Sequence, residues 1–135
     1  MVDVELRSAV AMREVLAAAK NRGIGIVVSA HYFHRTPTLA QMRERRKRAF
    51  AAGADIFKLA ALADSPASVA RLIDFVSTGK ARSLAVMGMG KLGQVSRLVL
   101  ACAGSALNYG YLDKPNAPGQ WEARELKRLL VRLGR

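Results

Sequence analysis

Apolar and polar positions along the chain follow two alternating periods, and this alternation predicts a series of βα units. Continuous or period-two apolar segments, typical of strands, cover residues 2–6, 24–30, 54–62, 83–87 and 105–111. Apolar residues three or four apart follow each of them, as in helices that bury one face. Five βα units in a row predict parallel strands joined by right-handed crossovers. Since no linker interrupts the pattern, we expect one domain over residues 1–135.

Several helix boundaries are marked by their residue types. Pro37 and Thr38 begin the second helix, and Ser65 followed by Pro66 gives the third helix an N-cap and a proline at its first position. The last helix is expected over residues 121–133. The spacing predicts that the fourth helix turns these residues toward the core: Val95, Leu98, Val99 and Cys102.

Polar and glycine residues gather where the predicted strands end. They occupy residues 31–37 after the second strand, Lys58 at the third, residues 88–93 after the fourth and residues 116–120 after the fifth. The carboxyl ends of parallel strands meet at one edge of the sheet, where α/β folds place their chemistry. The sequence therefore predicts a site at that edge.

Lys58 is the most unusual residue of this set, because it lies within an apolar segment, Ala54 to Leu62. Burial favours the neutral amine, which is a nucleophile that can form a Schiff base with a ketone. The alternative is a lysine whose ammonium group reaches water at the strand end. His31, at the end of the neighbouring strand, could move a proton beside such an imine, and His34 is a second candidate.

Composition limits the other classes of function. The formal charge of +12 attracts anions, but aromatic residues make up 6% and are not interleaved with the basic runs, so nucleic-acid binding is not expected. No apolar segment is long enough to cross a membrane, and the first residues are no signal peptide. The single cysteine, Cys102, fits a reducing cytoplasm, and two histidines with one cysteine supply no credible zinc site.

Residues 88–93 read Gly-Met-Gly-Lys-Leu-Gly, a literal G-x-G-x-x-G, and Asp113 follows 20 residues beyond Gly93. This is the fingerprint of a dinucleotide-binding domain, with Gly88, Gly90 and Gly93 against the pyrophosphate. The fingerprint normally stands on the first strand of such a domain, whereas three βα units precede it here. The other interpretation is a glycine turn that lets a loop pass close to a ligand.

The ordered set of motifs resembles type I 3-dehydroquinate dehydratase, a Schiff-base enzyme of the shikimate pathway and aromatic amino acid biosynthesis. The matching segments are Asp3-Val4-Glu5-Leu6, Ser29 to Pro37, Ala54 to Lys58, Met87 to Arg97, Gly104-Ser105 and Ala117 to Gln120. They occur in the family's order and cover essentially the whole chain. The resemblance implies a lyase that converts 3-dehydroquinate to 3-dehydroshikimate and water, with no metal and no dissociable cofactor.

The same resemblance implies residue roles. Lys58 would form the imine, His31 would be the general acid and base, and Arg97 would bind the substrate carboxylate. Separately from the resemblance, Asp3 or Glu5 is a candidate for a carboxylate that supports these groups from behind. Further substrate contacts are implied for Gln120, Asn116, Met87 and Met89.

The chain also departs from the family's pattern. Unusual residues stand at Ala30, Tyr32, Gly88 and Asn116. The family is an eight-stranded (β/α)8 barrel, and this chain begins where its fourth strand would, which predicts a partial TIM-barrel domain, the C-terminal five-eighths. The glutamate that orients the histidine would then be missing. We therefore expect self-association or a complementing N-terminal fragment, and little activity alone. A dinucleotide-binding module and a catalytically inactive homologue remain the alternatives.

Overall fold

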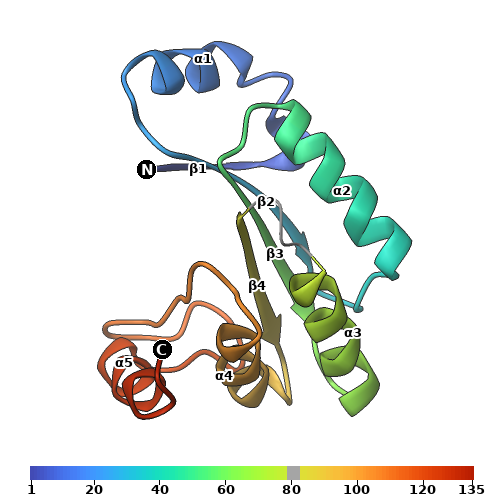
Figure 1. Cartoon of the computed structure of the whole chain (residues 1–135), viewed down its shortest axis with the longest axis vertical. Helices are drawn as coiled ribbons and strands as arrows, with labels where there is room; N and C mark the ends of the chain where they lie inside the picture. The colour runs from blue at the N-terminus through green and yellow to red at the C-terminus, as the bar shows by residue number, and fades with distance from the viewer. Residues whose placement is uncertain (79–82) are drawn as a thin grey trace.

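The computed structural model describes residues 1–78 and 83–135, and its centre is a parallel sheet. Within these residues the sheet has four strands in the order β1-β2-β3-β4 (Figure 1). The strands are β1 Val2–Glu5, β2 Ile26–Tyr32, β3 Ile56–Leu62 and β4 Ser83–Met89. The helices are η1 Leu6–Ser8, α1 Arg13–Asn21, α2 Leu39–Ala51, α3 Pro66–Ser77, α4 Gly93–Cys102 and α5 Ala123–Arg132. The predicted alternation of parallel strands and helices is confirmed.

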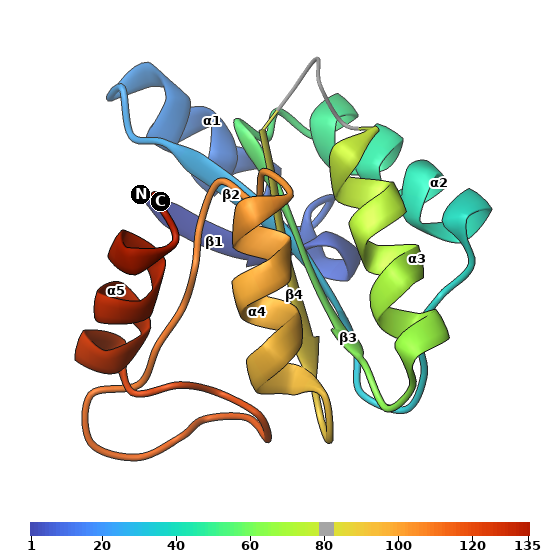
Figure 2. The same cartoon turned by 60° about the horizontal axis from the view of Figure 1, so that its bottom comes forward.

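One face of the sheet is covered by helices, and the residues between the two layers form the main core. Figures 1 and 2 show α2 and α3 side by side along this face, with α4 beside β4. Phe57 of β3 and Phe75 of α3 are fully buried there, with ring centroids 6.3 Å apart. The opposite face carries a smaller cluster at its β4 side, made by Ala60, Met87, Met89, Tyr109 and Ala117. The two faces therefore have different tasks, one packing and one presenting side chains.

The helix starts follow from the residues that the sequence marks. Thr38 caps α2 and forms a capping box with Gln41, each side chain bonding the other's backbone N–H. Ser65 accepts a hydrogen bond from the N–H of Ser68 at the start of α3, where Pro66 is the first residue. Because both caps sit directly after β2 and β3, they fix where the chain leaves the sheet.

The fifth predicted strand, residues 105–111, does not form. The Ala106 N–H donates to the Leu84 carbonyl at 2.7 Å, so the segment starts beside β4. The Ser105 hydroxyl then takes the place of a backbone ladder, because it accepts from the Val86 N–H at 2.9 Å and lies 3.2 Å from the Val86 carbonyl. Farther on, Tyr111 forms an isolated bridge with Glu122. A side-chain hydroxyl thus replaces backbone pairing in this segment, and the alternation of apolar and polar residues cannot predict such a replacement.

The predicted core face of α4 is wrong for Val95 and Cys102, whereas Leu98 and Val99 are half-buried. Val95 is 57% exposed and Cys102 is exposed, whereas Ser96, Arg97, Leu100 and Ala101 are buried. Ser96 can turn inward because its hydroxyl donates to the Gly93 carbonyl at 2.7 Å. Small and hydrogen-bonded residues occupy the space against β4 that hydrophobicity alone assigns to valine and cysteine.

Candidate active site

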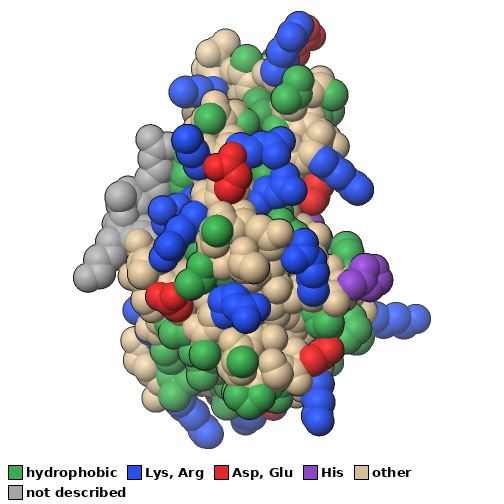
Figure 3. All heavy atoms as spheres, turned by 90° about the vertical axis from the view of Figure 1, so that its right-hand side faces the viewer, with side chains coloured by type: hydrophobic (Ala, Val, Ile, Leu, Met, Phe, Trp, Pro, Cys, Tyr) green, Lys and Arg blue, Asp and Glu red, His purple; other side chains and the backbone are tan. Residues whose placement is uncertain are grey.

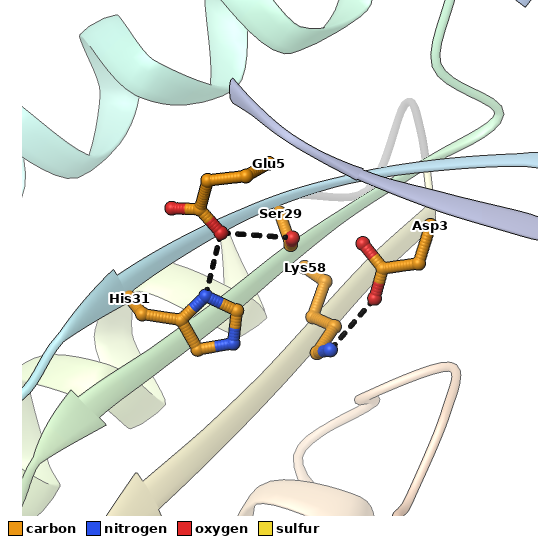
Figure 4. A network of polar contacts seen from close by, with 5 residues as sticks. All are labelled: Asp3, Glu5, Ser29, His31 and Lys58. Atoms are coloured by element: carbon orange, nitrogen blue, oxygen red, sulfur yellow. Dashed lines mark hydrogen bonds and ion pairs between the residues drawn. The ribbon is translucent and has the colours of Figure 1, made fainter. Parts of the chain in front are cut away.

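Five polar side chains from the first three strands point to the same face of the sheet. Residues two apart on a strand share a face, so Asp3 and Glu5 lie together on β1, as do Ser29 and His31 on β2. The register places Glu5 beside Ser29 and Ser29 beside Lys58. Figure 4 shows the five side chains close to one another on this face. The two-residue period of the strands and their register therefore bring these five side chains together.

Lys58 is held between a carboxylate and an aromatic ring. Its Nζ lies 2.7 Å from Asp3 Oδ2 and 4.8 Å from the ring centroid of Tyr109, and its side chain is 14% exposed. The apolar segment around Lys58 indicates neither of these neighbours. The amine is therefore anchored at the open face of the sheet rather than extended into water.

His31 is oriented by Glu5, two residues along β1 from Asp3, so the expectation that the chain lacks a glutamate to orient this histidine is wrong. Its Nδ1 lies 2.7 Å from Glu5 Oε2, and the Ser29 hydroxyl donates to the same oxygen at 3.2 Å. The ring also stacks on Phe33 with centroids 5.8 Å apart. A partner on Nδ1 fixes the ring so that Nε2 faces away from Glu5, as Figure 4 shows. His34 is exposed.

Arg97 lies at the other side of the site, on α4, and is only 3% exposed. Its Nε donates to the Gly119 carbonyl at 3.2 Å and its Nη1 to the Tyr109 carbonyl at 3.0 Å. Burial lowers the pKa of the guanidinium, because desolvation disfavours the charged form. No acidic residue within the described ranges forms an ion pair with it. Arg97 is therefore a buried cation whose partners are neutral carbonyls.

The glycine turn at residues 88–93 is occupied by the chain's own loop. The Gly90 N–H donates to the Pro118 carbonyl at 3.0 Å, and a Cβ on Gly93 would lie 2.8 Å from the Gly119 Cα. Asp64 accepts from the Lys91 N–H at 3.1 Å. The Pro118 carbonyl and the Asp64 carboxylate thus accept from backbone N–H groups that would face phosphate in a dinucleotide-binding fingerprint. The turn therefore serves close backbone packing.

The remaining predicted contacts lie on that loop. Gln120 Oε1 accepts from the Asn116 N–H at 2.8 Å, so the glutamine closes the loop on itself. Asn116 is exposed. Met87 and Met89 are buried in the small cluster with Tyr109. Two residues that the sequence did not single out are Ser29 and Tyr109: register with Lys58 could have indicated Ser29, whereas no periodic signal marks Tyr109.

On the face that Figure 3 shows, Lys and Arg side chains are spread among apolar and neutral atoms rather than gathered in a stripe. Over residues 1–78 and 83–135, no three His, Cys, Asp or Glu side chains are grouped as metal ligands. No helix in the same ranges is long and apolar enough to span a membrane.

Comparisons with known proteins identify the family. The family model for type I 3-dehydroquinase matches residues 1–135. The 3-dehydroquinate dehydratase of Methanosarcina barkeri is 37% identical over 96% of this chain and 55% of its own length. That of Klebsiella pneumoniae is 33% identical over 96% and 54%.

Solved structures give the same result. The crystal structure of 3-dehydroquinate dehydratase from Geobacillus kaustophilus superposes with a TM-score of 0.90 at 31% identity, over 98% of this chain and 53% of that one. The type I enzyme from Clostridium difficile, solved with covalently modified comenic acid, gives 0.87 at 30% identity, over 97% and 54%. The chain spans about half the length of these relatives, and it belongs to the type I 3-dehydroquinase family.

Proposed function

We propose that this chain supplies the imine-forming site of a 3-dehydroquinate dehydratase, which converts 3-dehydroquinate to 3-dehydroshikimate and water. The observation that carries the proposal is the placement of Lys58 and His31 on one face, each held by a carboxylate of β1 at 2.7 Å. The amine and the imidazole are the two groups that a Schiff-base dehydration needs, and Figure 4 shows both on the same face of the sheet.

The chemistry follows from these two groups. The Lys58 amine, after passing its proton to Asp3, attacks the substrate ketone, and loss of water gives the imine. His31 Nε2 then takes a proton from the carbon next to the imine, whose nitrogen accepts the electron pair. The same imidazolium returns the proton to the departing hydroxyl, which leaves as water. Hydrolysis of the imine frees Lys58, so the net change is loss of one water from the substrate.

Arg97 supports the proposal from the other side of the site. Arg97 is a buried guanidinium without an acidic partner in the described residues, and a substrate carboxylate beside it would offset the cost of burying the charge. Met87 and Met89 would line the same pocket, and Asn116 and Gln120 would contact substrate hydroxyls from their loop. Neither metal nor cofactor enters this scheme.

The same proposal includes a partial-barrel fold for this chain. Residues 1–135 would form one domain that follows the course of the last five-eighths of a (β/α)8 barrel, with the segment at 105–111 replacing a regular strand. Among the described residues β1 pairs with β2 alone, so its other edge has no strand beside it. An apolar pocket of about 480 Å³ also opens between α1 and the end of α2. We infer that the chain associates, with itself or with a segment supplying the first three units, in a reducing cytoplasm.

Borohydride trapping tests the site. Reduction in the presence of 3-dehydroquinate should add the mass of the reduced adduct to one peptide, the one containing Lys58. Lys58→Ala should abolish the adduct, and Lys91→Ala, in the glycine turn, should leave it intact. An adduct on Lys91, or NAD binding without any adduct, would overturn the proposal.

Sedimentation and complementation test the association. The purified chain should sediment above its monomer mass of 14.6 kDa. Its turnover, followed by the ultraviolet absorbance of the conjugated product, should rise when the N-terminal part of the Methanosarcina barkeri dehydratase is added. A monomer with full activity by itself would contradict the need for a partner.

A further inference from the structure

A second pocket lies against the Glu5–His31 pair, where η1, the end of β2 and helix α2 meet. Its volume is about 170 Å³, and Arg7, Tyr32 and Arg45 line it together with Glu5 and His31. Arg97 and the glycine turn are not part of it. The dehydration scheme gives Arg7, Tyr32 and Arg45 no task, so the pocket needs its own explanation.

The charges around this pocket are unbalanced. Arg45 Nε donates to the Tyr32 hydroxyl at 3.1 Å, and the Arg35 guanidinium lies over the Tyr32 ring at 5.8 Å from its centroid. In residues 1–78 and 83–135, no acidic side chain forms an ion pair with Arg7, Arg35 or Arg45. The only carboxylate lining the pocket, Glu5, already uses its Oε2 for His31 and Ser29. The pocket therefore presents guanidinium groups in excess of its carboxylate.

We propose that this pocket binds a small oxyanion, a phosphate or a carboxylate, beside His31. A guanidinium fork matches the oxygens of such a group, and two forks can take it from different sides. The pocket volume of about 170 Å³ is several times the roughly 30 Å³ that one water occupies in the liquid, so a group of phosphate size fits. Tyr32 fits this task, since its hydroxyl and ring hold Arg45 and Arg35 at a position where the family's pattern has an acidic or amide residue.

Nuclear magnetic resonance of the two histidines tests the site without any enzyme assay. His31 lines the pocket, and exposed His34 serves as an internal reference. Titration with inorganic phosphate, at ionic strength held constant with sodium chloride, should shift the ring C–H resonances of His31 saturably and leave those of His34 nearly unmoved. A shift that grows linearly for both rings, or none at all, would overturn the proposal.

Matched variants decide whether the arginines bind the anion. Loss of a charge-assisted hydrogen bond should weaken phosphate binding about tenfold or more in Arg45→Gln. Arg43→Gln, two residues away on α2 and outside the pocket, should bind phosphate as the parent chain does. Since Arg45 also contacts Tyr32, Arg7→Gln provides a second variant whose side chain has no hydrogen bond or ion pair within the described residues. Equal binding in all variants would exclude the pocket.

Experiments with acetate and with the trapped adduct distinguish a site for a free anion from a part of the substrate site. Acetate should shift His31 in the same direction as phosphate if the site accepts a free anion. Phosphate should still bind after Lys58 has been trapped with 3-dehydroquinate, because Arg97 lies on another element. If the adduct abolishes phosphate binding, the pocket belongs to the substrate site and a separate oxyanion site is refuted.

Discussion

The two halves of the candidate site are built in different ways. The strand half, Asp3, Glu5, Ser29, His31 and Lys58, consists of side chains that contact one another across β1, β2 and β3. The loop half, Arg97, Tyr109, Asn116, Gly119 and Gln120, is held by side chains that bond backbone groups. The first depends on register, and the second on how closely two segments of backbone approach.

This difference determines how each half fails when it is altered. In the strand half a substitution removes one chemical group, while the parallel ladder keeps its neighbours in place. In the loop half a substitution that separates the backbones moves several groups together. Tyr109 connects the halves, because its ring lies over Lys58 and its carbonyl accepts from Arg97. The comparison therefore predicts chemical defects on one side and conformational defects on the other.

The largest effect is expected for His31→Ala. Loss of a general acid and base should slow turnover by about 10²- to 10⁴-fold, while the imine at Lys58 still forms. The measurement combines product absorbance, in the chain complemented with the N-terminal part of a relative, with borohydride trapping of the variant.

His34→Ala is the matched control for this prediction, because His34 is exposed and three residues away. It should keep both turnover and trapping. Unchanged turnover in His31→Ala would transfer the role to His34 and would remove the chemical argument for the strand half.

Arg97→Met should weaken substrate binding by roughly 10- to 100-fold, the value of one to two charge-assisted hydrogen bonds. It should also loosen the loop, because the Tyr109 and Gly119 carbonyls lose their donor. Affinity can be read from the 3-dehydroquinate concentration that gives half-maximal trapping. Arg43→Met, at an exposed position of α2, should leave that concentration unchanged, and an equal effect of both would indicate a general loss of positive charge.

The same division explains how much of the structure the sequence predicts. Part of the strand half could be predicted, since period-two spacing puts Asp3 with Glu5 and Ser29 with His31 on one face. The contacts of Glu5 with His31 and of Asp3 with Lys58 could not, because they depend on how the three strands pair. The loop half could not be predicted. The Ser105 hydroxyl replaces a strand ladder, and on α4 Arg97 is buried whereas Val95 is exposed. Hydrophobic periodicity records burial of apolar side chains. It does not record a polar side chain that is buried because backbone carbonyls satisfy it.

Gly93→Ala should disturb the loop half without changing any reactive group. A Cβ at this position would lie 2.8 Å from the Gly119 Cα and 3.0 Å from its carbonyl oxygen, so the loop must move. We expect a loss of about 1–3 kcal/mol in the free energy of unfolding, as for overpacking, measured by denaturant titration. Lys58 should still be trapped, at higher substrate concentration.

Gly25→Ala is the control for this substitution. Its added Cβ meets atoms only at ordinary contact distances, the nearest at 3.5 Å from the Met1 side chain. It should change the unfolding free energy far less than Gly93→Ala. Equal losses would show that the close approach of Gly93 and Gly119 is not what limits the loop.

The smallest effect is expected at the end of the loop half, where Glu122 caps α5. Backbone N–H groups of Arg124 and Glu125 donate to its carboxylate and hold the pKa of Glu122 below its usual value. A carboxylate whose pKa is lower in the folded state stabilises fully above its unfolded pKa, about 4.3, and this contribution disappears as the pH falls through the lower folded value. Acid should therefore loosen α5, whereas the hydroxyl caps Thr38 and Ser65 of α2 and α3 do not titrate.

Amide hydrogen exchange, compared between neutral pH and pH below about 4, measures this effect helix by helix after correction for intrinsic rates. Protection in the first turn of α5 should fall in acid more than protection in the first turns of α2 and α3. Glu122→Thr supplies a cap that does not titrate, so α5 in this variant should lose no more protection in acid than the other two helices. An unchanged acid response of α5 in Glu122→Thr would assign the effect to other carboxyl groups.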